Sequence, residues 1–161
     1  MTRTAAEVDV LFRRLGRDVL LSWAGTAGSF DDADLATNRR RGPRGSIVDA
    51  DVATDLAQAD QMLVNRLMTR RGELAPLGHP DYGSRHHELI GEPNTERNRN
   101  LVKLYILQAL KGEPRIAKVE RCVVHHEERP RDIVRIELTI RLIDEPTPLN
   151  LVIPVELGAG A

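Results

Sequence analysis

The stretch "GEPR", residues 112–115, places an acid and a base on either side of a proline. Pro114 fixes its own φ and biases Glu113 toward an extended conformation, so the side chains on this turn are held in place. Arg115 carries a rigid fork of donors that suits a carboxylate or backbone carbonyls. The stretch is either a helix stop with solvated charges or a rigid, charged contact for another chain.

The histidines suggest metal binding, but their spacing does not suit it. His86 and His87 are adjacent, His125 and His126 are adjacent, and His79 stands alone. Neighbouring residues point about 100° apart on a helix and to opposite faces on a strand. Zinc-binding helices use a spacing of four residues instead. We therefore expect no metal site.

Nucleophiles and paired acids give no clearer signal. Cys122 lies in a strand-like pattern, typical of a small buried hydrophobe, and Ser84 follows "DYG", typical of a helix cap. Glycoside hydrolysis needs two carboxylates across a cleft, and no local signature marks such a pair among the 24 Asp and Glu residues. Aromatic residues make up only 3%, which argues against a sugar-binding cleft. We expect no catalytic residue, no cofactor and no enzyme; a peptidoglycan-cleaving, lysozyme-like hydrolase is the enzymatic alternative.

An arginine-rich stretch could contact phosphates. "NRRRGPR", residues 38–44, holds Arg39, Arg40, Arg41 and Arg44, and the acidic "DDAD" before it would offset their charge. The net charge of −1 creates no general attraction for nucleic acid or anionic membrane. We expect neither as a partner, with a small nucleic-acid-binding module as a further alternative.

Helical periodicity indicates two long helices. Residues 52–74 place apolar side chains on one stripe, and residues 94–112 include a run, 101–110, that is apolar on nearly every side and therefore predicts a buried helix. The stripe of the first helix consists of Leu56, Ala59, Leu63 and Leu67. Between the helices we expect a loop rich in Gly and Pro, followed by a short helix at 84–90.

The rest of the chain has the pattern of β-strands. Residues 132–144 alternate strictly between apolar and polar, 149–157 repeat the pattern, and 116–128 form a third strand with poorer alternation. We therefore predict an α+β fold, with N-terminal helices packed on a small C-terminal antiparallel β-sheet, a meander of about three strands. Pro154 cannot donate to a ladder and predicts that the last strand is an edge.

The chain divides in composition near residue 51. Residues 1–51 form an N-terminal segment whose Gly-, Asp- and Arg-rich part, 24–46, is interpreted as a flexible loop or a hairpin tip, and residues 52–161 form the α+β domain. A single cysteine excludes an intrachain disulfide, and no secretory signal or membrane-spanning run is recognisable. We expect the protein to be made and assembled in the cytoplasm.

The order of several motifs resembles a known family. "RRGEL", "PDYGSRHHELIGEPN", "ERNRNLVKLYILQAL" and "EPRI", followed by alternating strands, is similar to the baseplate wedge or sheath-initiator family of contractile tails. Relatives occur in contractile phages, type VI secretion systems and phage-tail-like extracellular injection machines. The likeness spans about residues 52–157, and "DYGS" with "EPR" is its most specific part. His86 departs from the pattern, which has an apolar residue such as leucine there.

This resemblance implies a structural protein. Family members lie in the inner baseplate, in six copies around the central tube, as parts of a phage tail or phage-tail-like particle. The family's "EPR" motif contacts the core bundle of the wedge proteins. The sheet templates the first sheath ring by strand pairing, and inner-tube or spike-hub proteins are further candidate partners. The partner-binding residues expected from the resemblance are Glu113, Pro114, Arg115, Tyr82, Gly83, Leu151, Ile153 and Val155.

Overall fold

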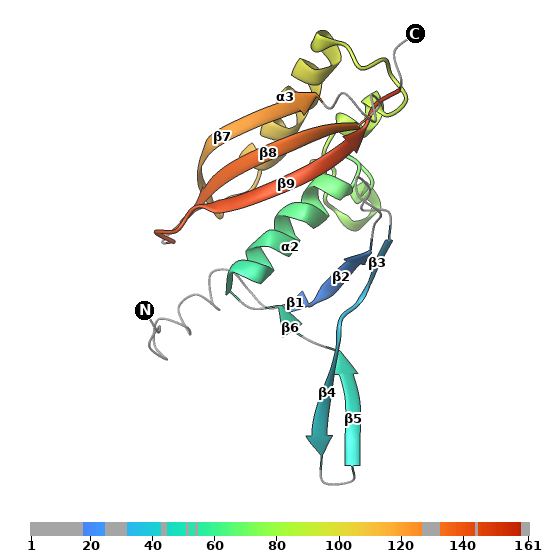
Figure 1. Ribbon diagram of the computed structural model, residues 1–161, viewed down its shortest axis with the longest axis vertical. Coiled ribbons are helices and arrows are strands. Elements are labelled where there is room, and N and C mark those ends of the chain that lie inside the picture. The colour runs from blue at the N-terminus through green and yellow to red at the C-terminus, as the bar shows by residue number, and fades with distance from the viewer. Residues whose placement is uncertain are drawn as a thin grey trace. The chain divides into compact units, whose positions relative to one another are not determined.

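The computed structural model describes residues 18–24, 32–42, 45–50, 52–53, 55–126, 133–143 and 145–158 (Figure 1). The described residues form two compact units, one up to Met62 and one from Leu63 onward. No helix among them has the length and hydropathy needed to cross a membrane.

The first unit contains three antiparallel pairs of short strands. They are β1 (Asp18–Val19) with β6 (Val52–Ala53), β2 (Leu21–Ala24) with β3 (Asp32–Leu35), and β4 (Thr37–Gly42) with β5 (Gly45–Ala50). The expected loop at 24–46 is therefore largely strand, and the alternative of a hairpin is confirmed for β4 and β5. Their pairing runs out to Gly42 and Gly45 without any hydrophobic alternation that could have predicted it. The flexibility of this segment stays a prediction, and its arginine side chains lie outside the described residues.

A glutamine holds the first strands to a helix. Helix α2 (Asp55–Met68) carries Gln61, whose Oε1 accepts a hydrogen bond from the Leu21 N–H at 2.8 Å. The Gln61 Nε2 donates to the Val19 carbonyl at 2.8 Å. The buried amide thus satisfies a backbone donor and a backbone acceptor that a two-stranded pair leaves open.

The second unit confirms the predicted α+β class. Strands β7 (Ile116–His126), β8 (Ile133–Leu142) and β9 (Leu149–Glu156) form one antiparallel sheet in the order β7-β8-β9. Helix α3 (Glu96–Lys111) precedes them and packs against β7, and Figure 1 shows it on one side of the sheet. Strand β9 is an edge, as Pro154 predicted.

The core lies on one face of this sheet. The burial pattern of β8 follows the alternation of the sequence, and β9 repeats it. The buried side chains come from α2, α3 and the two strands: Leu63, Leu67, Val102, Ile106, Leu110, Val134, Ile136, Leu138, Ile140, Leu142, Leu149, Leu151, Ile153 and Val155. Burying a side chain of this size stabilises the fold by about 1.5–3 kcal/mol.

The chain beyond β9 is tied back to the loop before α3. The Gly158 N–H donates to the Glu92 carbonyl at 2.7 Å, and the Asn94 N–H donates to the Gly158 carbonyl at 3.1 Å. A Cβ on Gly158 would collide with the Gly91 carbonyl oxygen, so a glycine is required at this crossing. The direction of the edge strand is thereby fixed at its C-terminal end.

The "DYGS" stretch is fixed to the end of α2. The Ser84 N–H donates to the Thr69 carbonyl at 2.9 Å, and the Arg71 N–H donates to the Ser84 carbonyl at 3.1 Å. This pairing explains why α2 ends at Met68 rather than at the predicted residue 74. Gly83 has φ +97°, and a Cβ there would lie 2.6 Å from the Thr69 carbonyl oxygen. Gly83 therefore permits both the turn and the close backbone approach.

Gly83→Ala should destabilise the protein more than Gly78→Ala. Gly78 has φ +86°, and a Cβ there would meet nothing within 4 Å, so its replacement adds only backbone strain of about 1 kcal/mol. At Gly83 the same strain is joined by a backbone collision, and we expect a total loss of roughly 2–4 kcal/mol. Urea unfolding of both variants measures the difference, and equal losses would show that the close approach is not present in solution.

Candidate functional site

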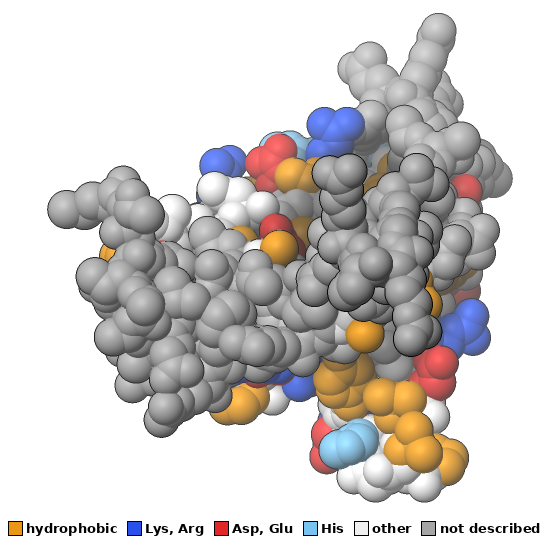
Figure 2. Space-filling model, turned by 90° about the horizontal axis from the view of Figure 1, so that it is seen from below, with side chains coloured by type: hydrophobic (Ala, Val, Ile, Leu, Met, Phe, Trp, Pro, Cys, Tyr) orange, Lys and Arg blue, Asp and Glu red, His pale blue; other side chains and the backbone are white. Residues whose placement is uncertain are grey.

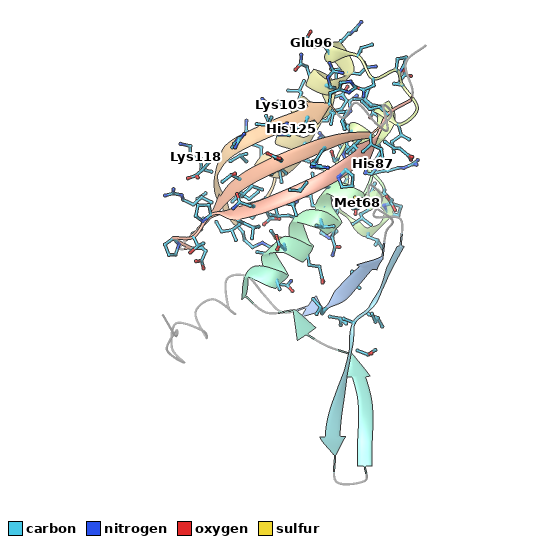
Figure 3. The ribbon with its side chains drawn as sticks, viewed as in Figure 1. Met68, His87, Glu96, Lys103, Lys118 and His125 are labelled. Carbon is cyan, nitrogen blue, oxygen red and sulfur yellow. The ribbon has the colours of Figure 1, made fainter. Side chains whose placement is uncertain are left out.

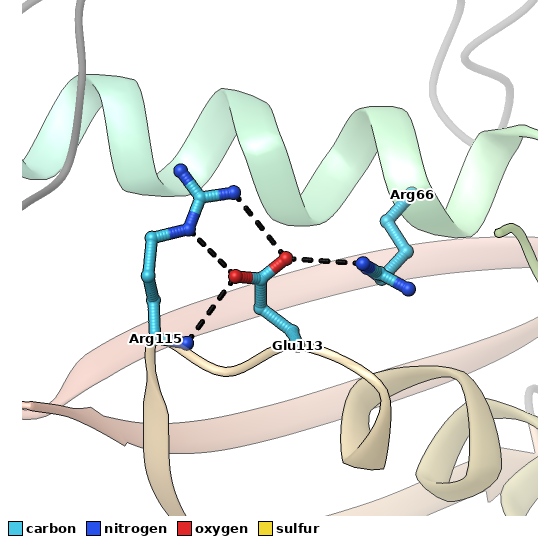
Figure 4. Close-up of polar contacts among 3 residues, drawn as sticks. All are labelled: Arg66, Glu113 and Arg115. Carbon is cyan, nitrogen blue, oxygen red and sulfur yellow. Dashed lines mark hydrogen bonds and ion pairs between the residues drawn. The ribbon is translucent and has the colours of Figure 1, made fainter. Parts of the chain in front are cut away.

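A buried carboxylate lies at the centre of the "GEPR" turn. Glu113 is only 4% exposed, and both of its oxygens accept hydrogen bonds from guanidinium groups (Figure 4). Its Oε1 accepts from the Arg115 Nε at 2.6 Å, and its Oε2 accepts from the Arg66 Nη2 at 3.1 Å. The Arg115 Nη2 and backbone N–H also donate to the carboxylate, each at 3.3 Å. Glu113 is thus bound on both sides within its own chain.

The cluster keeps Glu113 ionised. Burial alone would raise the pKa of Glu113, but the hydrogen bonds and charge of Arg115, together with the charge of Arg66, hold it below its ordinary value of 4.5. A carboxyl group of this kind is a permanent anion near neutral pH and a poor general acid. Two guanidinium groups, those of Arg66 and Arg115, face this one carboxylate.

Arg66 is the member that the sequence analysis missed. It is 8% exposed, lies on α2 beside the fully buried Leu67, and points its guanidinium at Glu113. Gly112 lies next to this guanidinium, because a Cβ added there would be 3.4 Å from the Arg66 Nη1, an ordinary contact distance. Its position on the apolar stripe of the helix could have identified Arg66 from the sequence, because a charged side chain buried there requires a partner.

Tyr82 joins the two motifs. The Arg66 guanidinium carbon lies over the Tyr82 ring, 4.5 Å from its centroid, within the range of a cation–π contact. Burial raises the pKa of Tyr82, Arg66 and Arg115 lower it, and Glu113 raises it, so the hydroxyl is electrostatically coupled to the whole cluster. The "DYGS" and "EPR" motifs, far apart in sequence, therefore meet at the end of α2.

The predicted partner residues divide into buried and accessible ones. Glu113 and Gly83 are buried and serve contacts within the chain. Pro114 is exposed, Tyr82 is half-buried, and the Arg115 side chain is 33% exposed. Their binding to a partner stays a prediction, and the accessible part of this surface consists of Tyr82, Pro114 and Arg115.

The edge strand offers a second candidate surface. Leu151, Ile153 and Val155, predicted as partner-binding residues, are 9%, 1% and 4% exposed and face the core. Only the backbone of β9 and its outward side chains, such as the 49% exposed Val152, are accessible to another chain. Pairing with such a chain would therefore use main-chain hydrogen bonds, as in strand addition.

The two edges of the sheet differ in regularity. Strand β7 has two register shifts against β8, one between Ile116 and Lys118 and one between Val119 and Arg121. Strand β9 pairs with β8 without a shift from Leu149 to Glu156. Bulges protect an edge against further pairing, and so does a proline such as Pro154, so the part of β9 best suited to accept a strand is the regular stretch before Pro154.

The adjacent histidines of η2 (His86–Leu89) make hydrogen bonds within the chain. His86 is buried, with its Nδ1 2.8 Å from the Ser84 Oγ, and the His87 Nε2 donates to the Leu67 carbonyl at 2.8 Å. Figure 3 shows His87 beside the end of α2, near Met68. Burial, with a smaller effect from His87, lowers the pKa of His86 to about 3, so His86 is neutral. The polar His86 thus occupies a buried position, where its ring is satisfied by Ser84.

Other chemistry-bearing side chains have structural surroundings. Burial raises the pKa of the Cys122 thiol, partly offset by Lys103, which keeps the thiol protonated. His125 lies 3.0 Å from Glu137 on the sheet face opposite the core. Within the described parts of the chain, no three His, Cys, Asp or Glu side chains are grouped closely enough to hold a metal ion.

Glu113→Gln should destabilise the protein far more than Arg115→Ala. Glu113→Gln leaves Arg66 buried without its anion, and breaking a buried ion pair from one side costs about 3 kcal/mol or more. Arg115 is the more exposed partner, and Arg66 still faces Glu113 after its removal, so this loss should be smaller, roughly 1–2 kcal/mol. Urea unfolding at neutral pH compares the two variants, and equal losses would contradict the central position of Glu113.

The same variant has a defined pH dependence. Because the folded-state pKa of Glu113 is depressed, its stabilisation is present above its ordinary value of 4.5 and is lost as pH falls toward the folded-state pKa. The stability difference between the wild type and Glu113→Gln should therefore narrow in acid.

His86→Leu should remove a separate loss of stability at mildly acidic pH. Since the pKa of His86 falls from 6.5 to about 3 on folding, only the unfolded chain binds this proton between those values. Wild-type stability should drop by roughly 1–2 kcal/mol between about pH 7.5 and about pH 5, above the range where Glu113 titrates. His86→Leu should lose less of its free energy of unfolding over the same pH range, which urea unfolding at several pH values would measure. Parallel stability curves would mean that His86 is not buried as a neutral group.

Comparisons with known proteins find a similar fold. No protein-family model matches the chain, and no curated protein matches it. Among solved structures, a protein from Geobacter sulfurreducens described as a "putative tail lysozyme" is similar with a TM-score of 0.51 and 24% sequence identity. The match covers 64% of this chain and 95% of that one. At this identity the likeness is one of fold, and it connects the α+β architecture to a protein associated with tails.

Proposed function

We propose that this chain is a structural component of the inner baseplate of a phage tail or contractile injection system. It docks on wedge proteins through the "GEPR" turn and templates sheath assembly through its C-terminal sheet. The observation that carries the proposal is the convergence of "DYGS" and "EPR" on Arg66 at the end of α2. The fold likeness to a tail protein supports the same class of particle.

The turn is built as a rigid contact. The Glu113 N–H donates to the Leu110 carbonyl at 3.0 Å, and the Ile143 N–H donates to the Arg115 carbonyl at 2.9 Å. With Glu113 clamped between Arg66 and Arg115, the exposed Pro114 and the accessible side of Arg115 are pre-ordered. A pre-ordered contact loses little conformational entropy on docking. The exposed part of the Arg115 guanidinium suits an acidic group on the partner.

The regular edge of β9 provides the second contact. An extended arm from a sheath subunit would add to β9 by main-chain hydrogen bonds. The exposed Val152 would favour an arm that places an apolar side chain beside it. A chain bound at both contacts would link the wedge to the first sheath ring. Rearrangement of the baseplate would then reach the sheath through this chain.

A lysozyme-like activity is the competing proposal, because the similar structure carries that description. A glycosidase of the common type needs a carboxylic acid with a raised pKa opposite a carboxylate. Arginine lowers the pKa of both Glu113 and Glu88, whereas burial raises that of Asp60. Lysis in a peptidoglycan zymogram that Asp60→Asn abolishes would overturn the structural proposal.

Arg115→Ala should leave the fold intact and block the assembly of sheathed particles, since the docking charge is lost. Arg85→Ala is a matched control, because Arg85 is another accessible arginine paired with a glutamate, Glu88, at 2.8 Å. Electron microscopy of particles from cells producing each variant measures the effect. Sheathed particles at wild-type numbers with Arg115→Ala would refute the docking role.

A further inference from the structure

A closed loop projects from the end of α2. Residues 70–84 leave and return at the same point, where Arg70 and Ser84 form a parallel bridge. The Gly72 N–H donates to the Tyr82 carbonyl at 3.4 Å and closes the base further. Compact loops with joined ends are frequently functional.

The loop is rigid by construction. The N–H groups of Leu77 and His79 both donate to the Leu74 carbonyl at 3.0 Å, around the 3-10 turn η1 (Ala75–Leu77). The sequence adds Pro76 and Pro80, which restrict the backbone further. An ion pair of 2.6 Å between Arg71 and Asp81 joins its two sides.

The tip of the loop is exposed and apolar. All residues from 75 to 81 are exposed, and Leu77, at 73%, is the most exposed large hydrophobic side chain of the described residues. Figure 2 shows that hydrophobic side chains gather at the surface on one side of this view of the molecule, with a histidine beside them. Turn residues are usually Gly, Pro, Asn, Asp or Ser, so the geometry of the turn does not require a leucine at this position.

We propose that Leu77 is a hydrophobic plug that inserts into an apolar pocket of the wedge partner. A rigid leucine gains the free energy of burial and loses little entropy on binding. The base of the loop includes Tyr82, which contacts Arg66 of the docking cluster, so the plug and the "GEPR" turn belong to one continuous structure. This inference rests on the proposed docking function and names a second contact for it.

The charges around the loop favour a protein pocket over a lipid surface. Arg70, Arg71, Glu73 and Asp81 sum to zero formal charge, so the tip has no electrostatic attraction to anionic lipid. One leucine beside two prolines also offers far less apolar area than a membrane-binding helix.

The test measures binding of the full-length chain to the wedge protein of the same particle, by calorimetry. Leu77→Ala should weaken binding roughly tenfold. The same change at Leu104, a 46% exposed leucine on α3, is the control and should leave affinity unchanged. Both variants should have the same melting temperature as the wild type, because neither leucine is buried.

The outcomes separate the inference from the proposed function. No binding by the wild-type chain would overturn both. Wild-type binding with undiminished affinity in Leu77→Ala would overturn the plug alone. Two further results would also overturn the plug. One is a dimer seen by sedimentation that Leu77→Ala abolishes, because Leu77 would then bind a second copy of the chain. The other is flotation with phosphatidylcholine–phosphatidylglycerol vesicles that Leu77→Ala abolishes, because Leu77 would then bind a membrane.

Discussion

The ion pair between Arg66 and the buried carboxylate of Glu113 is the constraint on which the candidate site depends. A carboxylate inside a protein is costly unless it is paired and hydrogen-bonded, and here two guanidinium groups provide both conditions. The arrangement joins the end of α2 to the turn between α3 and β7. It also sets Arg115 and Pro114 at the surface. The two charged residues of "GEPR" therefore differ in position, because Glu113 is buried and holds the turn while Arg115 is partly exposed at its edge.

The same end of α2 organises the second motif. Gly83 allows the backbone to approach Thr69, and His87 caps the Leu67 carbonyl, so the last turn of the helix receives hydrogen bonds from a distant segment. Tyr82 then lies beside Arg66. A helix end, a tight turn and an ion pair together produce a surface that none of them forms alone. Rigid positioning of this kind suits the proposed docking role, because groups that are already ordered lose little conformational entropy on binding.

Much of the second unit could be predicted from the sequence. Strict alternation in residues 132–144 and 149–157 specified which faces are buried, and Pro154 specified the edge, because both follow from local stereochemistry. The pairing of Arg66 with Glu113 could not be predicted, since it joins residues that meet only through the tertiary fold. The hairpin alternative for residues 24–46 was right for β4 and β5, but these strands could not be told from a loop because they lack alternation. The length of α2 was overestimated at both ends, because Val52–Ala53 form β6 and Arg70 leaves the helix to pair with Ser84.

In the proposed function, one small domain combines a docking turn with a strand edge that pairs with another chain. Cryo-electron microscopy of assembled particles containing this chain tests that claim most directly. We predict density for the chain in the baseplate, with Arg115 against helices of the wedge and β9 extended by a strand from the first sheath ring. A baseplate without this chain, or one in which the β9 edge stays unpaired and Arg115 faces solvent, would contradict it.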